Sequence, residues 1–123
     1  MVRRIEQDTL IIEDEQGKLI MSLKESISDD VFSMAVAGDI KNEVAPEFED
    51  ELMTALTICS RIELDFSGVD YISGPGLRVL LSVQQMIDGE AGRVMVIKNV
   101  SAPAMKIFKE TGFADLLYIE EAG

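Results

Sequence analysis

The chain has 123 residues, enough for one domain that buries its own hydrophobic core. Hydrophobic residues make up 47% of it, which excludes an intrinsically disordered body. The formal net charge of −12 argues against nucleic acid or an anionic membrane as a partner, because phosphate groups would be repelled.

Cysteine use and hydropathy point to the cytoplasm. Cys59 is the only cysteine, so no disulfide can form within the chain and a reducing compartment is favoured. Its place at the apolar end of a helical pattern predicts a small core residue rather than a nucleophile. The first residues contain acids and no long apolar run, unlike a signal peptide, and no segment is long enough for a transmembrane helix.

Residues 1–18 leave two interpretations open. Thr9 to Ile12 is a candidate strand and Asp14 to Gly17 resembles a turn, so a hairpin that returns through Leu19 to Leu23 fits the pattern. A flexible acidic arm fits it equally well. The sequence therefore predicts an N-terminal extension or hairpin over 1–18 and a domain over 19–123.

The next segments predict two strands and a helix. Leu19 to Leu23 and Val31 to Ala37 read as antiparallel strands joined through a polar turn at Asp29 and Asp30. Asn42 is a candidate N-cap for a helix whose apolar residues recur from Val44 to Cys59 at helical spacing. Acidic residues lie off that apolar stripe and predict a strongly acidic helix face: Glu47, Asp50 and Glu51, with Glu43 in the first turn.

The most informative stretch runs from Ile62 to Ile87. Ile62, Leu64 and Phe66 alternate with acids, which predicts a strand. A turn-like patch and the polar loop Ser73-Gly74-Pro75-Gly76 follow, and from Leu77 the apolar period becomes helical. A strand, a loop and an amphipathic helix make half of a βαβ unit, in which the loop commonly carries function.

The rest of the chain continues the alternation. The nearly unbroken apolar run Arg93 to Ile97 predicts a covered parallel strand, and Ser101 is the expected N-cap of a helix that stops at Thr111-Gly112. A short strand over 117–119 and an acidic tail, Glu120-Glu121, complete the chain. The expected order is β-β-α-β-α-β-α-β, an α/β fold with a mixed sheet and helices packed against it.

Enzymatic chemistry finds little support. Asp65 and Asp70 could be paired carboxylates, but the chain has no histidine and places no nucleophile beside a base. No spacing suits a metal ion and no loop suits a nucleotide phosphate, so neither metal nor cofactor is expected. Ser73 has two interpretations: a structural helix cap, or a phosphoacceptor whose phosphate would be stabilised at the helix N-terminus.

Three segments in order resemble the STAS domain family of bacterial anti-sigma-factor antagonists. The run ELDFSGVDYISGPGLRVLL is similar to the family's strand–loop–helix signature, which holds a phosphorylatable serine. VMVIKNVSAPAMKIFKETGFADLLYI resembles the following strand, helix and final strand, and FSMAVAGDIKNEVAPEFEDEL resembles the second strand and first helix. The similarity covers about Leu19 to Ile119 and implies a STAS-like sheet in a single layer.

Two departures set this chain apart from the family pattern. Where the family reads Asp-Ser-Ser-Gly, this chain has Ser73-Gly74-Pro75-Gly76, so Pro75 occupies the usual phosphoacceptor position and Ser73 that of the aspartate. Lys41 stands where the family has an acid associated with nucleotide and kinase contact. The resemblance thus supports the fold but not the standard phosphorylation switch.

The resemblance implies a non-enzymatic, cytoplasmic module that binds an anti-sigma factor or another serine-kinase-type regulatory protein. The expected contacts are the loop Ser73, Gly74, Pro75 and Gly76 and a charged surface of Asp39, Lys41, Glu43, Glu47, Asp50 and Glu51. Two alternatives remain open: a cytosolic STAS accessory subunit of a membrane transporter, and a regulatory domain that binds a nucleotide or another small molecule. The oligomeric state is left undetermined.

Overall fold

The protein, described by a computed structural model over residues 1–120, is built on one six-stranded mixed sheet in the order β1-β2-β3-β4-β5-β6. The strands are β1 (Val2–Glu6), β2 (Thr9–Glu13), β3 (Leu19–Ser28), β4 (Val31–Ala37), β5 (Arg61–Gly68) and β6 (Val94–Lys98). The helices are α1 (Ala45–Ile58), α2 (Gly74–Asp88) and α3 (Ala102–Thr111), with short 3₁₀ turns η1 (Asn42–Val44) and η2 (Phe113–Asp115).

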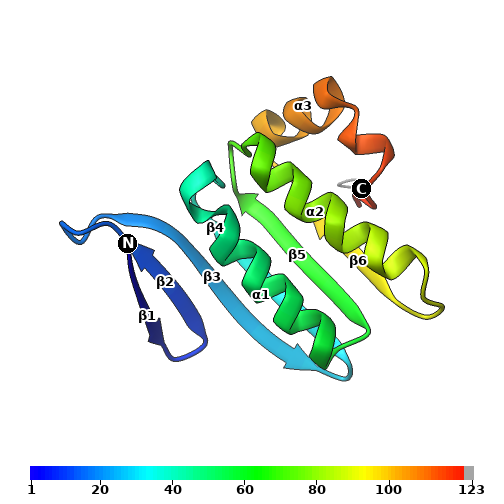
Figure 1. Ribbon diagram of the computed structural model, residues 1–123, viewed down its shortest axis with the longest axis horizontal. Coiled ribbons are helices and arrows are strands. Elements are labelled where there is room, and N and C mark those ends of the chain that lie inside the picture. Colours follow the sequence, from blue (N-terminus) through cyan, green and yellow to red (C-terminus); the bar gives the residue numbers. More distant parts are fainter. Residues whose placement is uncertain (121–123) are drawn as a thin grey trace.

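The sheet changes direction at β4. Strands β1 to β4 form an antiparallel meander, whereas β4, β5 and β6 run parallel and are connected through α1 and α2. Parallel neighbours need such crossovers, and α1 and α2 lie side by side over the same face of the sheet (Figure 1). This arrangement confirms the α/β fold class with its single mixed sheet.

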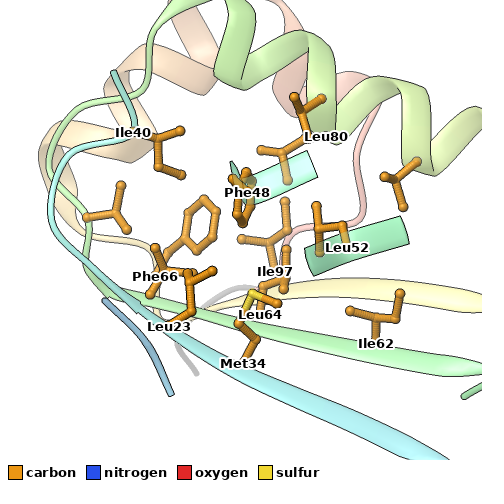
Figure 2. Close-up of a cluster of buried hydrophobic side chains, with 14 of the residues drawn as sticks. Leu23, Met34, Ile40, Phe48, Leu52, Ile62, Leu64, Phe66, Leu80 and Ile97 are labelled. Atoms are coloured by element: carbon orange, nitrogen blue, oxygen red, sulfur yellow. The ribbon is translucent and has the colours of Figure 1, made fainter. Parts of the chain in front are cut away.

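The core lies between that face and the helices. Alternate residues of the central strands are buried, as in Ile62, Leu64 and Phe66 of β5. Phe66 packs between Phe48 of α1 and Phe108 of α3, with ring centroids 6.3 Å and 6.4 Å away. Figure 2 shows β-strand and helix side chains meeting in this cluster. Cys59 is buried at its margin, as the helical pattern predicts.

The two ends of the chain differ from the simplest sequence interpretation. The expected hairpin from Thr9–Glu13 back through Leu19 is present, since β2 pairs with β3 in antiparallel register. An additional strand that the sequence did not indicate, β1, pairs with β2 and extends the sheet. The expected strand over 117–119 is reduced to one bridge between Ile97 and Ile119. Of the acidic tail, Glu120 is exposed and Glu121 lies outside the described residues.

Helix starts were predicted with mixed success. Ser73 and Ser101 cap α2 and α3, each hydroxyl accepting a hydrogen bond from a backbone N–H at 3.2 Å. Asn42 as a cap is wrong: it is the first residue of η1, and Lys41 at the cap position makes no side-chain bond. The α2 helix begins at Gly74, three residues before the apolar period becomes visible at Leu77.

Candidate functional site

The carboxyl ends of β4 and β5 bring two helix starts together. The chain leaves β4 and β5 and then pairs once more at a bridge between Ile40 and Ile72. Two backbone hydrogen bonds hold this bridge, from Ile40 N to Tyr71 O at 2.9 Å and from Ser73 N to Ile40 O at 2.8 Å. Because each segment enters a helix directly afterwards, η1 and α2 begin side by side at one end of the sheet.

Gly76 permits this close pairing. A Cβ atom on Gly76 would meet Ile40 Cγ2 at 2.8 Å and Ile72 Cγ2 at 3.0 Å. Gly74 is exposed, and only the Arg78 guanidinium, at 3.7 Å, would meet a side chain there. The bridge therefore requires glycine at position 76, because any side chain there would clash with it. Gly74 instead leaves the surface around it without a side chain and exposed to solvent.

Ser73 is buried beneath the loop. Ser73 is 3% exposed, and its Oγ accepts a hydrogen bond from the Gly76 N–H inside the first turn of α2. Its carbonyl accepts the Leu77 N–H at 2.9 Å, as expected for a helix N-cap. A kinase would have to open this turn to reach the hydroxyl. The geometry thus matches the cap interpretation, and phosphorylation of Ser73 remains a prediction.

Between the two helix starts lies a groove of about 270 Å³. Pro75 and Arg78 of α2 form one wall, and Pro46 and Glu49 of α1 form the other. The remaining lining residues are Asn42, Ala45, Val79 and Ser82. The sequence did not single out Arg78 or Glu49 as contacts. Arg78 lies one helical turn after Gly74 in α2. Its position next to the predicted loop was the sequence feature that could have indicated it as a contact.

The predicted charged surface divides into two parts. Asp39, Lys41 and Glu43 line a second groove, of about 580 Å³, at the same end of the sheet as the loop. Other acids there, Asp14 and Asp70, outnumber the additional base Lys18, so this end is negative overall. Its charge favours a basic partner and disfavours a bound anion.

The acids of α1 have different neighbours. Glu47 and Glu51 lie against Arg3 of β1, with nitrogen–oxygen distances of 3.0 Å and 3.4 Å. Asp50 is exposed between them. The two paired acids therefore face the N-terminal hairpin, which the helical periodicity alone could not indicate, while Asp50 remains accessible to a partner.

Asp65 and Asp70, the candidate pair of carboxylates, line different grooves. Partial burial of Asp65 acts to raise its pKa, but hydrogen bonds from Ser67 and Asn99 outweigh it and hold the pKa below its ordinary value. Asp70 is exposed. Among residues 1–120, no cluster of carboxylates and cysteine is suited to a metal ion. Across the same residues, no helix is long and apolar enough to span a bilayer.

Solved structures with a similar fold include two titled anti-sigma factor antagonist and one titled sulfate transporter family protein. A putative anti-sigma factor antagonist from Thermotoga maritima superposes with a TM-score of 0.72 at 18% identity, covering 81% of this chain and 86% of that one. An anti-sigma factor antagonist from Mycobacterium paratuberculosis gives 0.69 at 18% identity, with 83% and 86% coverage. A sulfate transporter family protein from Wolinella succinogenes gives 0.63 at 19% identity, with 76% of each chain covered.

Sequence comparison identifies the family more directly. No curated protein matches the chain significantly. A family model described as "Mlab, STAS domain" matches residues 23–118, which include the bridge, both helix starts and the groove between them. The chain belongs to the STAS domain family.

Proposed function

We propose that this protein is a non-enzymatic regulatory module that binds a protein partner through the end of the sheet where η1 and α2 begin. The observation that carries the proposal is the groove between Pro46 and Glu49 on one side and Pro75 and Arg78 on the other. It is flanked by the exposed residues Gly74 and Asn42. Binding residues commonly lie on loops that a rigid scaffold positions.

The charge around the groove supports a partner with a complementary basic patch. Asp39 and Glu43 line the neighbouring groove at this end, in a chain of net charge −12. Such charges speed encounter and select among partners more than they add affinity. The relatives titled anti-sigma factor antagonists support an anti-sigma factor or serine-kinase-type regulatory protein as the partner class.

The proposed module lacks the standard serine switch. Pro75 has no hydroxyl, and Ser73 is buried as a helix cap. The protein would then either bind its partner constitutively or be regulated through another group. The intact mass of the protein from its own cells tests this: a phosphate on Ser73 under any growth condition would contradict it.

A second candidate is an accessory subunit of a membrane transporter. The likeness to a sulfate transporter family protein supports it, and the same groove would serve as the contact surface. A nucleotide-binding role has less support, because Lys41 lies among the acids of its groove rather than in a basic pocket.

The test is affinity capture of the full chain from its own cells, followed by binding measurements with the purified partner. Glu49→Lys reverses an acidic charge in the groove, and the matched control Glu110→Lys reverses an exposed acidic charge on α3. We expect Glu49→Lys to weaken binding of a basic partner at least tenfold, since charge-assisted contacts contribute about 1.5–3 kcal/mol, and Glu110→Lys to leave it unchanged. Equal affinities for both variants would exclude this surface. Capture of transporter subunits would favour the second candidate.

A further inference from the structure

A third groove lies on the helix-covered face of the sheet. It runs along α1, toward the end of that helix that is farther from Ser73–Gly76. It has a volume of about 390 Å³ and lies between the C-terminal half of α1 and strands β1 to β3. Its lining residues are Ile5, Gln7, Asp8, Leu10, Glu25, Ser26, Ile27, Phe32, Glu51, Thr54 and Ile58. None of these residues lines the groove between the helix starts, so the two sites are separate.

The groove exists because the sheet is wider than its helical cover. The register pairs Ile5 with Leu10, Leu10 with Leu23 and Ile27 with Phe32. Leu10, Leu23 and Phe32 are buried core residues, which places Ile5 and Ile27 on the same, helix-covered side of the sheet. No helix among the described residues covers them there.

Three exposed isoleucines form the rim of the groove. Ile5 is 75% exposed, Ile27 56% and Ile58 50%. They come from β1, β3 and α1, three elements that are far apart in the sequence. Isolated exposed apolar residues are ordinary, but several gathered around one concave surface mark a binding site.

The charged side chains that line the groove are all carboxylic acids. Asp8, Glu25 and Glu51 line it, and no lysine or arginine does. Arg3 reaches Glu51 from outside the lining, at 3.4 Å, and also contacts Glu47. The Oε2 atom of Glu25 is buried and has no hydrogen-bond partner. A buried carboxylate oxygen without a donor is costly, so a donor supplied by a ligand would be stabilised.

Arg3 also limits what can enter. Its ion pairs with Glu47 and Glu51 join β1 to the N-terminal half of α1, and Glu51 also lines the groove. A partner helix laid along α1 would have to displace these pairs. The groove volume of about 390 Å³ is in the range of small-ligand pockets, which measure about 300–1,000 Å³.

We propose that this groove binds a small amphipathic cation, a molecule with an apolar chain and a protonated amine. The apolar chain lies against Ile5, Ile27 and Ile58, and the ammonium donates hydrogen bonds to Glu25 and Glu51. Burial, together with the neighbouring carboxyl group of Glu51, raises the pKa of Glu25 to about 8. Without a ligand Glu25 is therefore protonated at neutral pH, and the bound ammonium takes the place of that proton. The site does not depend on the proposed partner surface.

The experiment uses the full chain with labelled isoleucine methyl groups, observed by NMR. The probes are decylammonium and, as a matched neutral probe, decanol, both below the concentrations at which they aggregate. We expect decylammonium to shift the methyl signals of Ile5, Ile27 and Ile58 and to bind at least tenfold more tightly than decanol. The buried Ile40 and Ile72, at the other end of the sheet, serve as internal controls.

Two variants assign the charge contribution. Glu25→Gln should reduce the affinity for decylammonium at least tenfold and leave that for decanol unchanged. Glu110→Gln, on the exposed face of α3, should change neither. Equal binding of the two probes would overturn the proposal in favour of nonspecific apolar adsorption. Shifts at Ile5, Ile27 and Ile58 that depend on protein concentration without ligand would overturn it in favour of a second copy of the chain.

Discussion

At the scale of single residues, Ser73 keeps a polar residue within the family signature but uses it to cap a helix. The signature places a polar residue at the strand–helix junction, and here that residue satisfies the backbone of α2. Burial of the hydroxyl and its bond to the Gly76 N–H explain why a serine is useful there without phosphorylation. The neighbouring Pro75 contributes no N–H but adopts the first-turn position that suits proline.

Replacement of Ser73 by alanine should therefore affect stability. We expect Ser73→Ala to lower the free energy of unfolding by about 1 kcal/mol, because the Gly76 N–H loses its acceptor in a buried turn. Ser82→Ala, in the middle of the same helix, is the control and should not destabilise the protein, since alanine favours helix. Urea denaturation measures both. A Ser73→Ala variant as stable as the parent would show that the cap is dispensable.

Glu25 predicts a dependence of stability on pH. Asp8 and Glu51 line the groove beside it, and Arg3 is held by Glu47 and Glu51. Burial and Glu51 raise the pKa of Glu25 from 4.5 to about 8. The native state therefore holds this proton more tightly than the unfolded state. The contribution of protonated Glu25 to the free energy of unfolding is complete at low pH and is lost as the pH rises from about 4.5 to about 8.

The substitution Glu25→Gln removes this loss of stability at high pH, because glutamine does not ionise. After allowance for solvent screening, the variant should be more stable than the parent by on the order of 1 kcal/mol above pH 8, with little difference near pH 4. Urea denaturation across this pH range measures the difference, and Glu110→Gln supplies the baseline for an exposed carboxylate. A gap between Glu25→Gln and the parent that stays constant with pH would refute the assignment.

At the scale of elements, the C-terminus of α1 is completed by a residue distant in sequence. No basic residue lies in the last turn of α1. The Arg93 guanidinium, from the segment before β6, instead donates to the carbonyl oxygens of Leu56 and Cys59, the latter at 3.2 Å. A cation at this position also complements the helix dipole.

Loss of Arg93 should loosen this helix end. We expect Arg93→Met, which keeps an apolar stem, to lower the free energy of unfolding by about 1–2 kcal/mol. Arg61→Met, at the start of β5, removes an arginine whose side chain is more exposed than that of Arg93 and which pairs with Glu63. It should cost less than about 1 kcal/mol. Denaturant unfolding compares the two. If both substitutions cost the same, the capping contact contributes no more than a surface ion pair.

The elements also show what the sequence could and could not reveal. The period of two in Ile62, Leu64 and Phe66 predicted β5 because one face of that strand is buried. Arg93 could not be assigned to α1, since its contacts span more than thirty residues of sequence. In α2, Val79 and Val83 are buried together with Leu80 and Ile87, because α1 and β6 both pack against the helix and cover more of it than a single apolar stripe.

At the scale of the whole molecule, the sequence supported the family fold but left the first 18 residues undecided. Every residue of β1 is exposed, so no alternation could reveal it as a strand. The sequence indicated Ser73 as a helix cap, which the structure has. The groove beside it is formed jointly with α1, and the pairing of η1 with α2 depends on the bridge between Ile40 and Ile72. Contacts of this kind arise from tertiary packing, which local periodicity does not encode.

The N-terminal hairpin should be part of the cooperative unit rather than an appendage. Leu10 and Ile12 of β2 are buried in the same core as β3 and β4. Removing residues 1–18 would expose the surface they cover, and full burial of each side chain is worth about 1.5–3 kcal/mol. We therefore expect a chain of residues 19–123 to unfold at distinctly lower urea concentration than the full chain.

Two neighbouring isoleucines provide the sharper comparison, because they lie on opposite faces of the hairpin. Ile12 is fully buried, and Ile12→Ala should cost about 2–5 kcal/mol through lost contacts and a cavity. Ile11 lies half-buried on the other face, and Ile11→Ala should cost less than half as much. Urea denaturation of both variants and of 19–123 decides the question. If the truncated chain matched the full one and Ile12→Ala matched Ile11→Ala, the hairpin would be an independent arm, and the domain would begin at β3.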